Sequence, residues 1–191
     1  MGGNLLANLL GYEGEKSVLD AACVLCAPMK QWKCIKDIKE SLGGFYDRGM
    51  GKRWKQLIME HEQVLREHLE EKLEIDFETD FKTKEFTLLE MDDMVTGPLN
   101  GYKDRDDLYY NASCCHRIPS ITTPTFFMSS LDDPVVSSAA IEYENINANK
   151  HTVLGTTKFG GHIGYHTRTF TQEQWFMTPT LDFLDSFRID L

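Results

Sequence analysis

The sequence predicts an α/β fold in which helices cover both faces of a parallel sheet. Three short, mostly apolar runs, at residues 18–28, 124–128 and 151–154, are separated by segments of helical periodicity. Strands that are apolar at nearly every position are typical of parallel sheets buried between helices. Alternation of strand and helix also favours crossover connections, which join parallel strands.

The first element is predicted to be a helix over residues 2–12. Its leucines are spaced so that they would form one apolar stripe along the helix, and Gly11 or Gly14 would end it. The stripe consists of Leu5, Leu6, Leu9 and Leu10. The strand predicted at residues 18–28 follows directly.

Residues 29–100 differ in character, because they are charged and helical where the flanking segments are apolar. They are predicted to be a helical insertion between two strands. A long helix is expected over residues 54–73, with its apolar side chains on one face. The glycine-rich stretch 41–53 lacks the G-x-x-x-x-G-K-[ST] order of a phosphate-binding loop, so its Gly49–Lys52 part is predicted to connect helices.

Three more helices are expected in the second half of the chain. The helix predicted at residues 108–113 begins after two aspartates, where acidic side chains suit the helix dipole. A short helix is predicted at residues 137–144. A final helix is predicted at residues 173–187, and Pro179 is expected to bend or break it.

Composition excludes several classes of partner and site. The formal net charge of −10 argues against nucleic acid or an anionic membrane, because both would repel the chain. No apolar run approaches a membrane span, and the start lacks the features of a signal peptide. The C-x-x-C of Cys23 and Cys26 lies in a strand-like run that would turn the two thiols to opposite faces, and no second pair follows. No metal site is therefore expected, and a reduced, intracellular chain is the simpler interpretation.

Two polar turns follow predicted strands and are candidates for a site. Asp132-Asp133-Pro134 follows the run at residues 124–128, and Gly160-Gly161-His162 follows the run at 151–154. An Asp after one strand and a His after the next, about thirty residues on, is the spacing of the last two members of a Ser…Asp…His triad. Each turn alone is usually only a turn or a loop. Their order and spacing together favour a triad remnant.

The residues around these turns resemble the YheT-like branch of the α/β-hydrolases, which includes the abhydrolase-domain esterases and lipases. The resemblance covers essentially the whole chain. Phe126 departs from the pattern, since the family usually has an aliphatic residue there. The matching positions are Asp92, Gly101-Tyr102, Asp107-Leu108-Tyr109, Ser113, Ile121, Pro124, Met128, Asp132-Asp133-Pro134 and Gly160–Gly164.

The resemblance implies roles for the residues that are present. Asp133 corresponds to the charge-relay acid, with Asp132 as the second choice, and His162 corresponds to the general base. The main-chain N–H of Met1 corresponds to one donor of the oxyanion hole. The family's nucleophilic Ser, in G-x-S-M-G-G-N, would fall immediately before Met1. No Ser of this chain stands in a G-x-S-x-G context.

The sequence is therefore interpreted as the C-terminal part of a serine hydrolase of carboxylic esters, inactive by itself and with residues 29–100 as the lid. Its substrate would be a small ester or a lipid, and no cofactor is expected. Membrane contact would come through an upstream segment. The alternative is a non-catalytic pseudo-hydrolase that acts as a binding or interaction module.

Overall fold

The computed structural model describes residues 1–166 and 174–188, and the chain divides into two compact units. The first unit consists of Met1–Cys34 and Ala112–Leu191, and the second of Ile35–Asn111. The second unit overlaps most of the predicted insertion at residues 29–100 but extends further toward the C-terminus. No helix in the described part of the chain is long and apolar enough to cross a bilayer.

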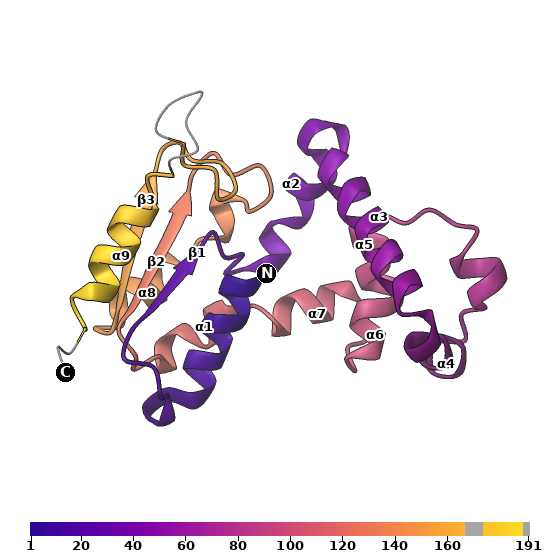
Figure 1. Ribbon diagram of the computed structural model, residues 1–191, viewed down its shortest axis with the longest axis horizontal. Helices are drawn as coiled ribbons and strands as arrows, with labels where there is room; N and C mark the ends of the chain where they lie inside the picture. Colours follow the sequence, from indigo (N-terminus) through magenta and orange to yellow (C-terminus); the bar gives the residue numbers. More distant parts are fainter. Residues whose placement is uncertain (167–173, 189–191) are drawn as a thin grey trace. The chain divides into compact units, whose positions relative to one another are not determined.

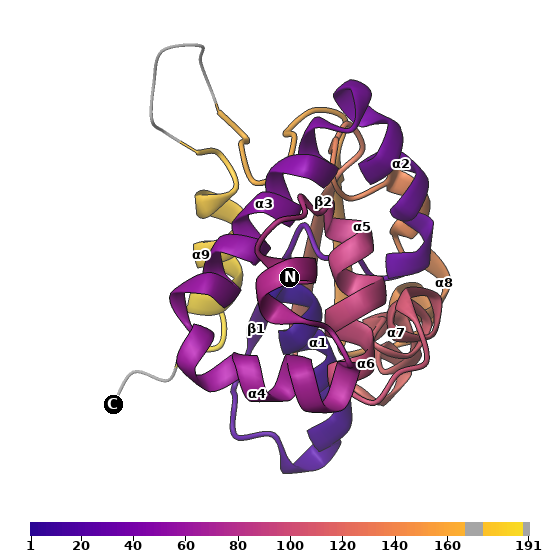
Figure 2. The same ribbon diagram turned by 90° about the vertical axis from the view of Figure 1, so that its right-hand side faces the viewer.

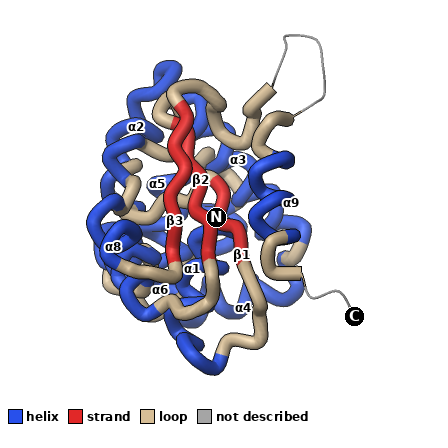
Figure 3. Tube along the Cα trace, turned by 90° about the vertical axis from the view of Figure 1, so that its left-hand side faces the viewer, coloured by secondary structure: helices blue, strands red, loops and turns tan. Residues whose placement is uncertain are grey.

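A three-stranded parallel sheet is the centre of the first unit, as predicted (Figure 3). The strands β1 (Ala22–Leu25), β2 (Thr125–Ser130) and β3 (Thr152–Thr157) lie in the order β1-β2-β3. Cα partners run from Thr125 with Thr152 to Ser130 with Thr157, so β2 and β3 end side by side. The turns that follow these strands therefore start at the same edge of the sheet.

Helices cover both faces of this sheet. On one face, α1 (Gly2–Glu13) and α8 (Tyr143–Ala148) share a buried apolar cluster with the strands. On the other face lies α9 (Met177–Asp185), where the rings of Phe126 and Phe183 are 5.6 Å apart (Figure 1). The helix predicted to start at Glu173 starts at Met177, and Glu173 lies outside the described residues.

Two predictions for these helices are wrong. Pro179 does not bend or break α9, because it is the third residue of the helix and proline is tolerated in a first turn. The helix predicted at residues 137–144 is instead a 3-10 turn, Ser138–Ala140, followed by α8. The Glu142 carboxylate starts α8 by accepting hydrogen bonds from the N–H groups of Glu144 and Asn145, each at 3.2 Å.

The buried face of α1 differs from the predicted leucine stripe. Leu10 is fully buried, but Leu5 and Leu9 are 62% and 48% exposed. The helix is oriented instead by Asn4, whose side chain donates to the carbonyl of Ala112 at 2.8 Å and accepts from the N–H of Cys114 at 3.0 Å. A buried amide without hydrogen-bond partners would destabilise the folded chain. The need to satisfy Asn4 therefore favours the orientation of α1 in which Asn4 faces inward.

The second unit is helical, and one buried cluster of aliphatic and phenylalanine side chains holds it together. Its helices are α2 (Ile35–Glu40), α3 (Phe45–Glu60), α4 (Glu62–Leu73), α5 (Leu88–Met91), α6 (Gly97–Leu99) and α7 (Arg105–Asn111), with π-helical turns at Phe77–Phe81 and Asp92–Thr96 (Figure 2). Other 3-10 turns in the described residues of the chain are Gly14–Lys16, Gln31–Lys33, Ser41–Gly43, Cys114–His116 and Ile118–Ser120.

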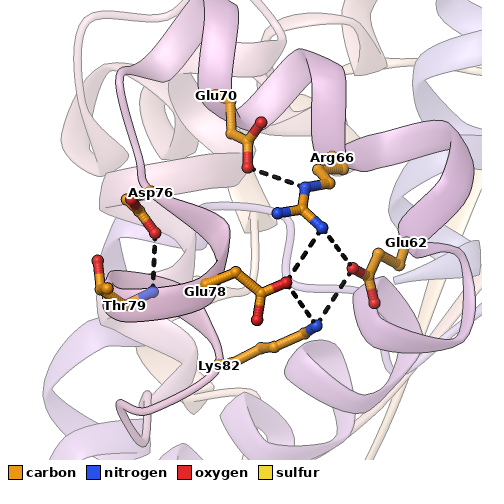
Figure 4. A network of polar contacts seen from close by, with 7 residues as sticks. All are labelled: Glu62, Arg66, Glu70, Asp76, Glu78, Thr79 and Lys82. Atoms are coloured by element: carbon orange, nitrogen blue, oxygen red, sulfur yellow. Dashed lines mark hydrogen bonds and ion pairs between the residues drawn. The ribbon is translucent and has the colours of Figure 1, made fainter.

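An ion-pair network ties the segment after α4 back to that helix (Figure 4). Arg66 contacts Glu62, Glu70 and Glu78, at 3.1, 2.9 and 3.1 Å, and Lys82 contacts Glu62 and Glu78 at 3.2 and 2.9 Å. Both cations also lie 5.4 Å from the centre of the Phe77 ring. Single exposed ion pairs stabilise little, but a shared network over a buried ring holds this segment in one place.

The helix predicted at residues 54–73 and the glycine-rich connection are both corrected. Two helices, α3 and α4, meet at His61, which has non-helical backbone angles. Gly49 and Gly51 lie inside α3, and the connection before it is the shorter stretch 41–44. Gly51 is required because a Cβ there would come within 2.1 Å of the carbonyl oxygen of Phe86.

We predict opposite effects of alanine at these two glycines of α3. Gly51→Ala forces the backbone of residues 86–87 away and should destabilise the chain by about 1–3 kcal/mol. Gly49→Ala meets nothing within 4 Å and should stabilise the helix by about 0.5–1 kcal/mol. Urea unfolding followed by circular dichroism measures both, and equal effects of the two variants would contradict the packing of α3 on this segment.

Candidate active site

The candidate residues gather where the parallel strands end. Asp132 and Asp133 follow β2, and His162 follows β3. Because β2 and β3 end in register, the two turns leave the sheet beside one another, at its carboxyl edge. Ligands of open α/β sheets bind in the crevice outside this edge.

Asp133 and His162 are in direct contact. Nδ1 of His162 lies 2.8 Å from Oδ2 of Asp133. The Asp133 side chain is 1% exposed, and the His162 side chain is 32% exposed. A carboxylate can only accept, so Nδ1 of the neutral imidazole carries the proton and Nε2 carries the lone pair. This arrangement leaves Nε2 free to act as a base on a side chain that is partly exposed to solvent.

Asp133 is fixed by its own turn as well as by His162. Its other oxygen, Oδ1, accepts the N–H groups of Val135 and Val136 at 2.8 and 2.9 Å. Aspartate readily accepts backbone N–H groups two or three residues on, and the intervening Pro134 has no N–H to offer. Both carboxylate oxygens therefore have partners, and the side chain is held in one orientation.

Asp132, the second choice for the relay acid, has different partners. Its Oδ1 accepts the main-chain N–H of Gly161 at 2.8 Å and the hydroxyl of Ser130. The Ser130 hydroxyl, followed by the Gly161 N–H, holds the pKa of Asp132 below its ordinary value of 3.8. Gly161 has a φ of 56°, in the left-handed region that favours glycine. Asp132 thus binds the loop that carries His162, while Asp133 contacts the imidazole.

Tyr165 and Cys26 support the same loop, and sequence reasoning missed both. The N–H of Tyr165 donates to the carbonyl of Gly160 at 2.9 Å, and its ring leaves no room for a Cβ on Gly160. Its hydroxyl lies 3.4 Å from Sγ of Cys26, at the end of β1. The ring also packs on Phe176, with centroids 5.5 Å apart. The signal in the sequence was a tyrosine that closes the Gly-Gly-His turn.

Cys26 also corrects the expectation for the C-x-x-C pair. It lies just after β1 with a φ of 46°, so strand alternation no longer applies to it. Cys23 donates to the carbonyl of Thr180 in α9, and Cys26 packs beside Phe176, so both thiols lie on the α9 side of the sheet. Burial raises the pKa of both thiols. All five cysteines are free.

Met1 stands apart from the Asp133–His162 pair in its contacts. It precedes α1, and its carbonyl accepts the N–H of Leu5 at 3.2 Å. Within residues 1–166 and 174–188, no hydrogen bond joins Met1 to Asp133 or His162. Its position at the start of a helix is where backbone N–H groups favour negative charge.

Comparison with known proteins identifies relatives of the chain. The chain is 28% identical over 193 residues to a monoacylglycerol lipase of Saccharomyces cerevisiae, covering 100% of this chain and 42% of the lipase. It is 28% identical over 178 residues to bovine phospholipase ABHD3, covering 93% of this chain and 41% of that protein. A medium-chain fatty acid ethyl ester synthase/esterase of Saccharomyces cerevisiae is 30% identical over 182 residues, covering 86% and 40%.

The chain is related to the α/β-hydrolase esterases and lipases. Its parallel sheet with flanking helices fits part of the α/β-hydrolase fold. The chain spans about two fifths of the length of these relatives. No family model matches the chain, and no solved structure shows significant similarity to it.

We predict that the amide of Gly161 reports the charge of Asp132. The pKa of Asp132 is depressed, so its hydrogen bond to Gly161 is present above pH 3.8 and is lost as the pH falls through the lower, folded-state pKa. In amide NMR spectra, the Gly161 resonance should shift in this acidic range. Asp132→Asn should abolish the shift, whereas Asp106→Asn, on the exposed start of α7, should leave it. A Gly161 resonance that titrates equally in Asp132→Asn would contradict the contact.

Proposed function

We propose that this chain carries the acid and base of a Ser-His-Asp triad that hydrolyses carboxylic esters. Asp133 is the relay acid, and His162 is the general base. The observation that carries the proposal is the 2.8 Å contact between Nδ1 of His162 and the buried Asp133 carboxylate. The relationship to esterases and lipases supports ester hydrolysis as the reaction.

The chemistry follows from this contact. Nε2 of His162 would accept the proton of a serine hydroxyl as that oxygen attacks the ester carbonyl, forming an acyl-enzyme, and would return the proton to the leaving alcohol. Water would then be activated by the same nitrogen to release the acid. Asp133 would hold the imidazole in the correct tautomer and stabilise the imidazolium that forms in each step.

The proposal also includes a nucleophilic serine and an oxyanion hole. The resemblance to G-x-S-M-G-G-N aligns Met1–Asn4 with the residues after the nucleophilic Ser. The main-chain N–H of Met1, at the start of α1, would then donate to the oxyanion of the tetrahedral intermediate. A helix start favours the negative charge that develops there.

Surface features of the first unit support an additional sheet element beside β1. Among the described residues, β1 pairs only with β2, which leaves its other edge open. Both helices that contact β1 expose leucines, since Leu5 and Leu9 of α1 and Leu181 of α9 are about half exposed or more. Open edges next to apolar side chains are usually covered in native proteins. The strand that leads into a G-x-S elbow fits such a place.

Substrate choice belongs to the proposal as well. The names of the relatives refer to monoacylglycerols, phospholipids and medium-chain ethyl esters. For this chain we propose a small ester or lipid as substrate, with the insertion at residues 29–100 as the lid.

A fluorophosphonate probe tests the triad, because it reacts only with an activated serine. We expect this chain by itself to remain unlabelled, and a form extended upstream through the G-x-S element to be labelled. His162→Ala in the extended form should reduce the labelling rate by about 10³-fold or more, because the serine loses its base. Gel fluorescence after timed exposure gives the rates.

Two variants separate catalysis from folding. Asp133→Asn keeps the shape of the side chain but loses the charge that stabilises the imidazolium, and it should also slow labelling strongly. His116→Ala, at a histidine outside the site, should label normally. If the extended form folds and remains unlabelled, or labels equally without His162, the triad fails, and a non-catalytic binding module becomes the better description.

A further inference from the structure

One corner of the unit Ile35–Asn111 has a surface that the proposed hydrolysis does not use. It is formed by α2, the turn 41–44 and the first half of α3, and we call it the α2–α3 corner. In both ribbon views, its turn lies at the end of this unit opposite α4 (Figures 1 and 2). The corner combines exposed cations with an exposed apolar tip.

The α2–α3 corner is basic in an acidic chain. Residues 35–55 carry six Lys or Arg side chains and three Asp or Glu side chains, whereas the whole chain has 20 and 30. One of the three acids, Asp47, is buried and accepts the N–H of Leu89 at 3.1 Å. The Asp47 carboxylate is therefore not exposed beside the cations of the corner. A strong local departure from the net charge indicates an electrostatic partner.

Four cations of the α2–α3 corner are exposed and lack a carboxylate partner. They are Lys36 and Lys39 of α2 and Arg48 and Lys52 of α3. The structure records no ion pair for any of the four within residues 1–166 and 174–188. Arg48 donates to the carbonyl of Gly43 at 2.8 Å, which keeps its guanidinium at the turn. Their charge is thus available to an external anion.

Two apolar side chains stand at the tip between these cations. Leu42 is 71% exposed and Phe45 is 62% exposed, and neither belongs to the buried cluster of the unit. Leu42 also has a φ of 48°, a left-handed conformation that is uncommon for leucine. A leucine in this conformation and without packing does not serve the core. Polar residues with better left-handed propensity, such as Asn, would satisfy the turn.

We propose that the α2–α3 corner docks on an anionic lipid surface. Leu42 and Phe45 would enter the interface, and the four cations would lie at the level of the lipid phosphates. Aromatic and aliphatic side chains flanked by Lys and Arg have the chemistry of interfacial binding. A purely electrostatic partner would use the cations but would leave the apolar tip in water.

Charge also determines which part of the chain faces the lipid surface. The chain outside the corner is strongly acidic in sum, so an anionic surface repels it and attracts the corner. The net charge predicts repulsion from an anionic membrane, and the proposal differs from that prediction for this local surface alone. Docking does not depend on the proposed triad, because the corner contains neither Asp133 nor His162. Vesicle binding can therefore be measured in the absence of hydrolysis.

Cosedimentation of the full chain with lipid vesicles tests the proposal. We expect binding to vesicles of phosphatidylcholine and phosphatidylserine in a two-to-one ratio, and little binding to phosphatidylcholine alone. Binding should weaken as sodium chloride is raised, because salt screens the surface potential. The combined variant Lys36→Gln, Lys39→Gln, Arg48→Gln and Lys52→Gln should lose about fivefold in partitioning per cation removed.

Matched variants control for charge, apolarity and folding. Lys16→Gln, Lys103→Gln, Lys150→Gln and Lys158→Gln change the net charge equally at exposed sites elsewhere and should retain binding. Leu42→Asn with Phe45→Ser should reduce binding about tenfold or more, since each apolar side chain contributes to insertion. Val18→Ser with Val64→Ser, at residues 89% and 68% exposed, should not. Circular dichroism and thermal unfolding verify that each variant is folded.

Several outcomes would overturn the lipid assignment. Equal binding to neutral vesicles, or equal loss in the control lysine set, would remove the role of the corner. Self-association through the corner, lost in Leu42→Asn with Phe45→Ser, would make a second copy the occupant. Binding to an RNA oligonucleotide that needs the cations but not Leu42 and Phe45 would make the surface an electrostatic one.

Discussion

Parallel pairing of β2 with β3 is the constraint on which the candidate site depends. Ser130 and Thr157 are Cα partners at the ends of the two strands, and the N–H of Leu131 continues the pairing to the carbonyl of Thr157 at 2.9 Å. Asp133 and His162 are 29 residues apart in sequence, yet they leave the sheet at one place. The sheet ladder brings the two turns to the same edge, and the contact of Asp132 with Gly161 then holds the loop of His162 beside Asp133.

Two adjacent carboxylates bind different groups at this edge of the sheet. Asp133 is buried and holds the imidazole, while Asp132 is exposed and holds the main chain of the loop at Gly161. Tyr165 and Cys26 add a third support from the side of β1. Because the loop is bound from two strands, the position of His162 follows from the sheet. Preorganisation of this kind lowers the cost of reaching a reactive geometry.

The sequence predicted the sheet and the proximity of Asp133 to His162 better than it predicted the helices. Apolar strands and the Asp-Asp-Pro and Gly-Gly-His turns are local signals, so the parallel sheet and the juxtaposition of Asp133 with His162 could be anticipated. The face of α1 could not, because Asn4 binds groups more than 100 residues away. Gly51 seemed to break a helix, but its role is close contact with the backbone of residues 86–87, which only the tertiary structure reveals.

The register between the strands also limits how such a site can change. Side chains alternate across a strand, so one inserted or deleted residue in β2 would turn every later side chain to the opposite face. Asp132 and Asp133 lie two and three residues beyond the end of β2, so such a change would also displace the turn that carries them and break the 2.8 Å contact between Asp133 and His162. During evolution, point substitutions at the sheet edge can arise and be selected one at a time. Changes of strand length would break the site in a single step, so lineages that retain the site are expected to vary in length in their helices and loops rather than in β2 or β3.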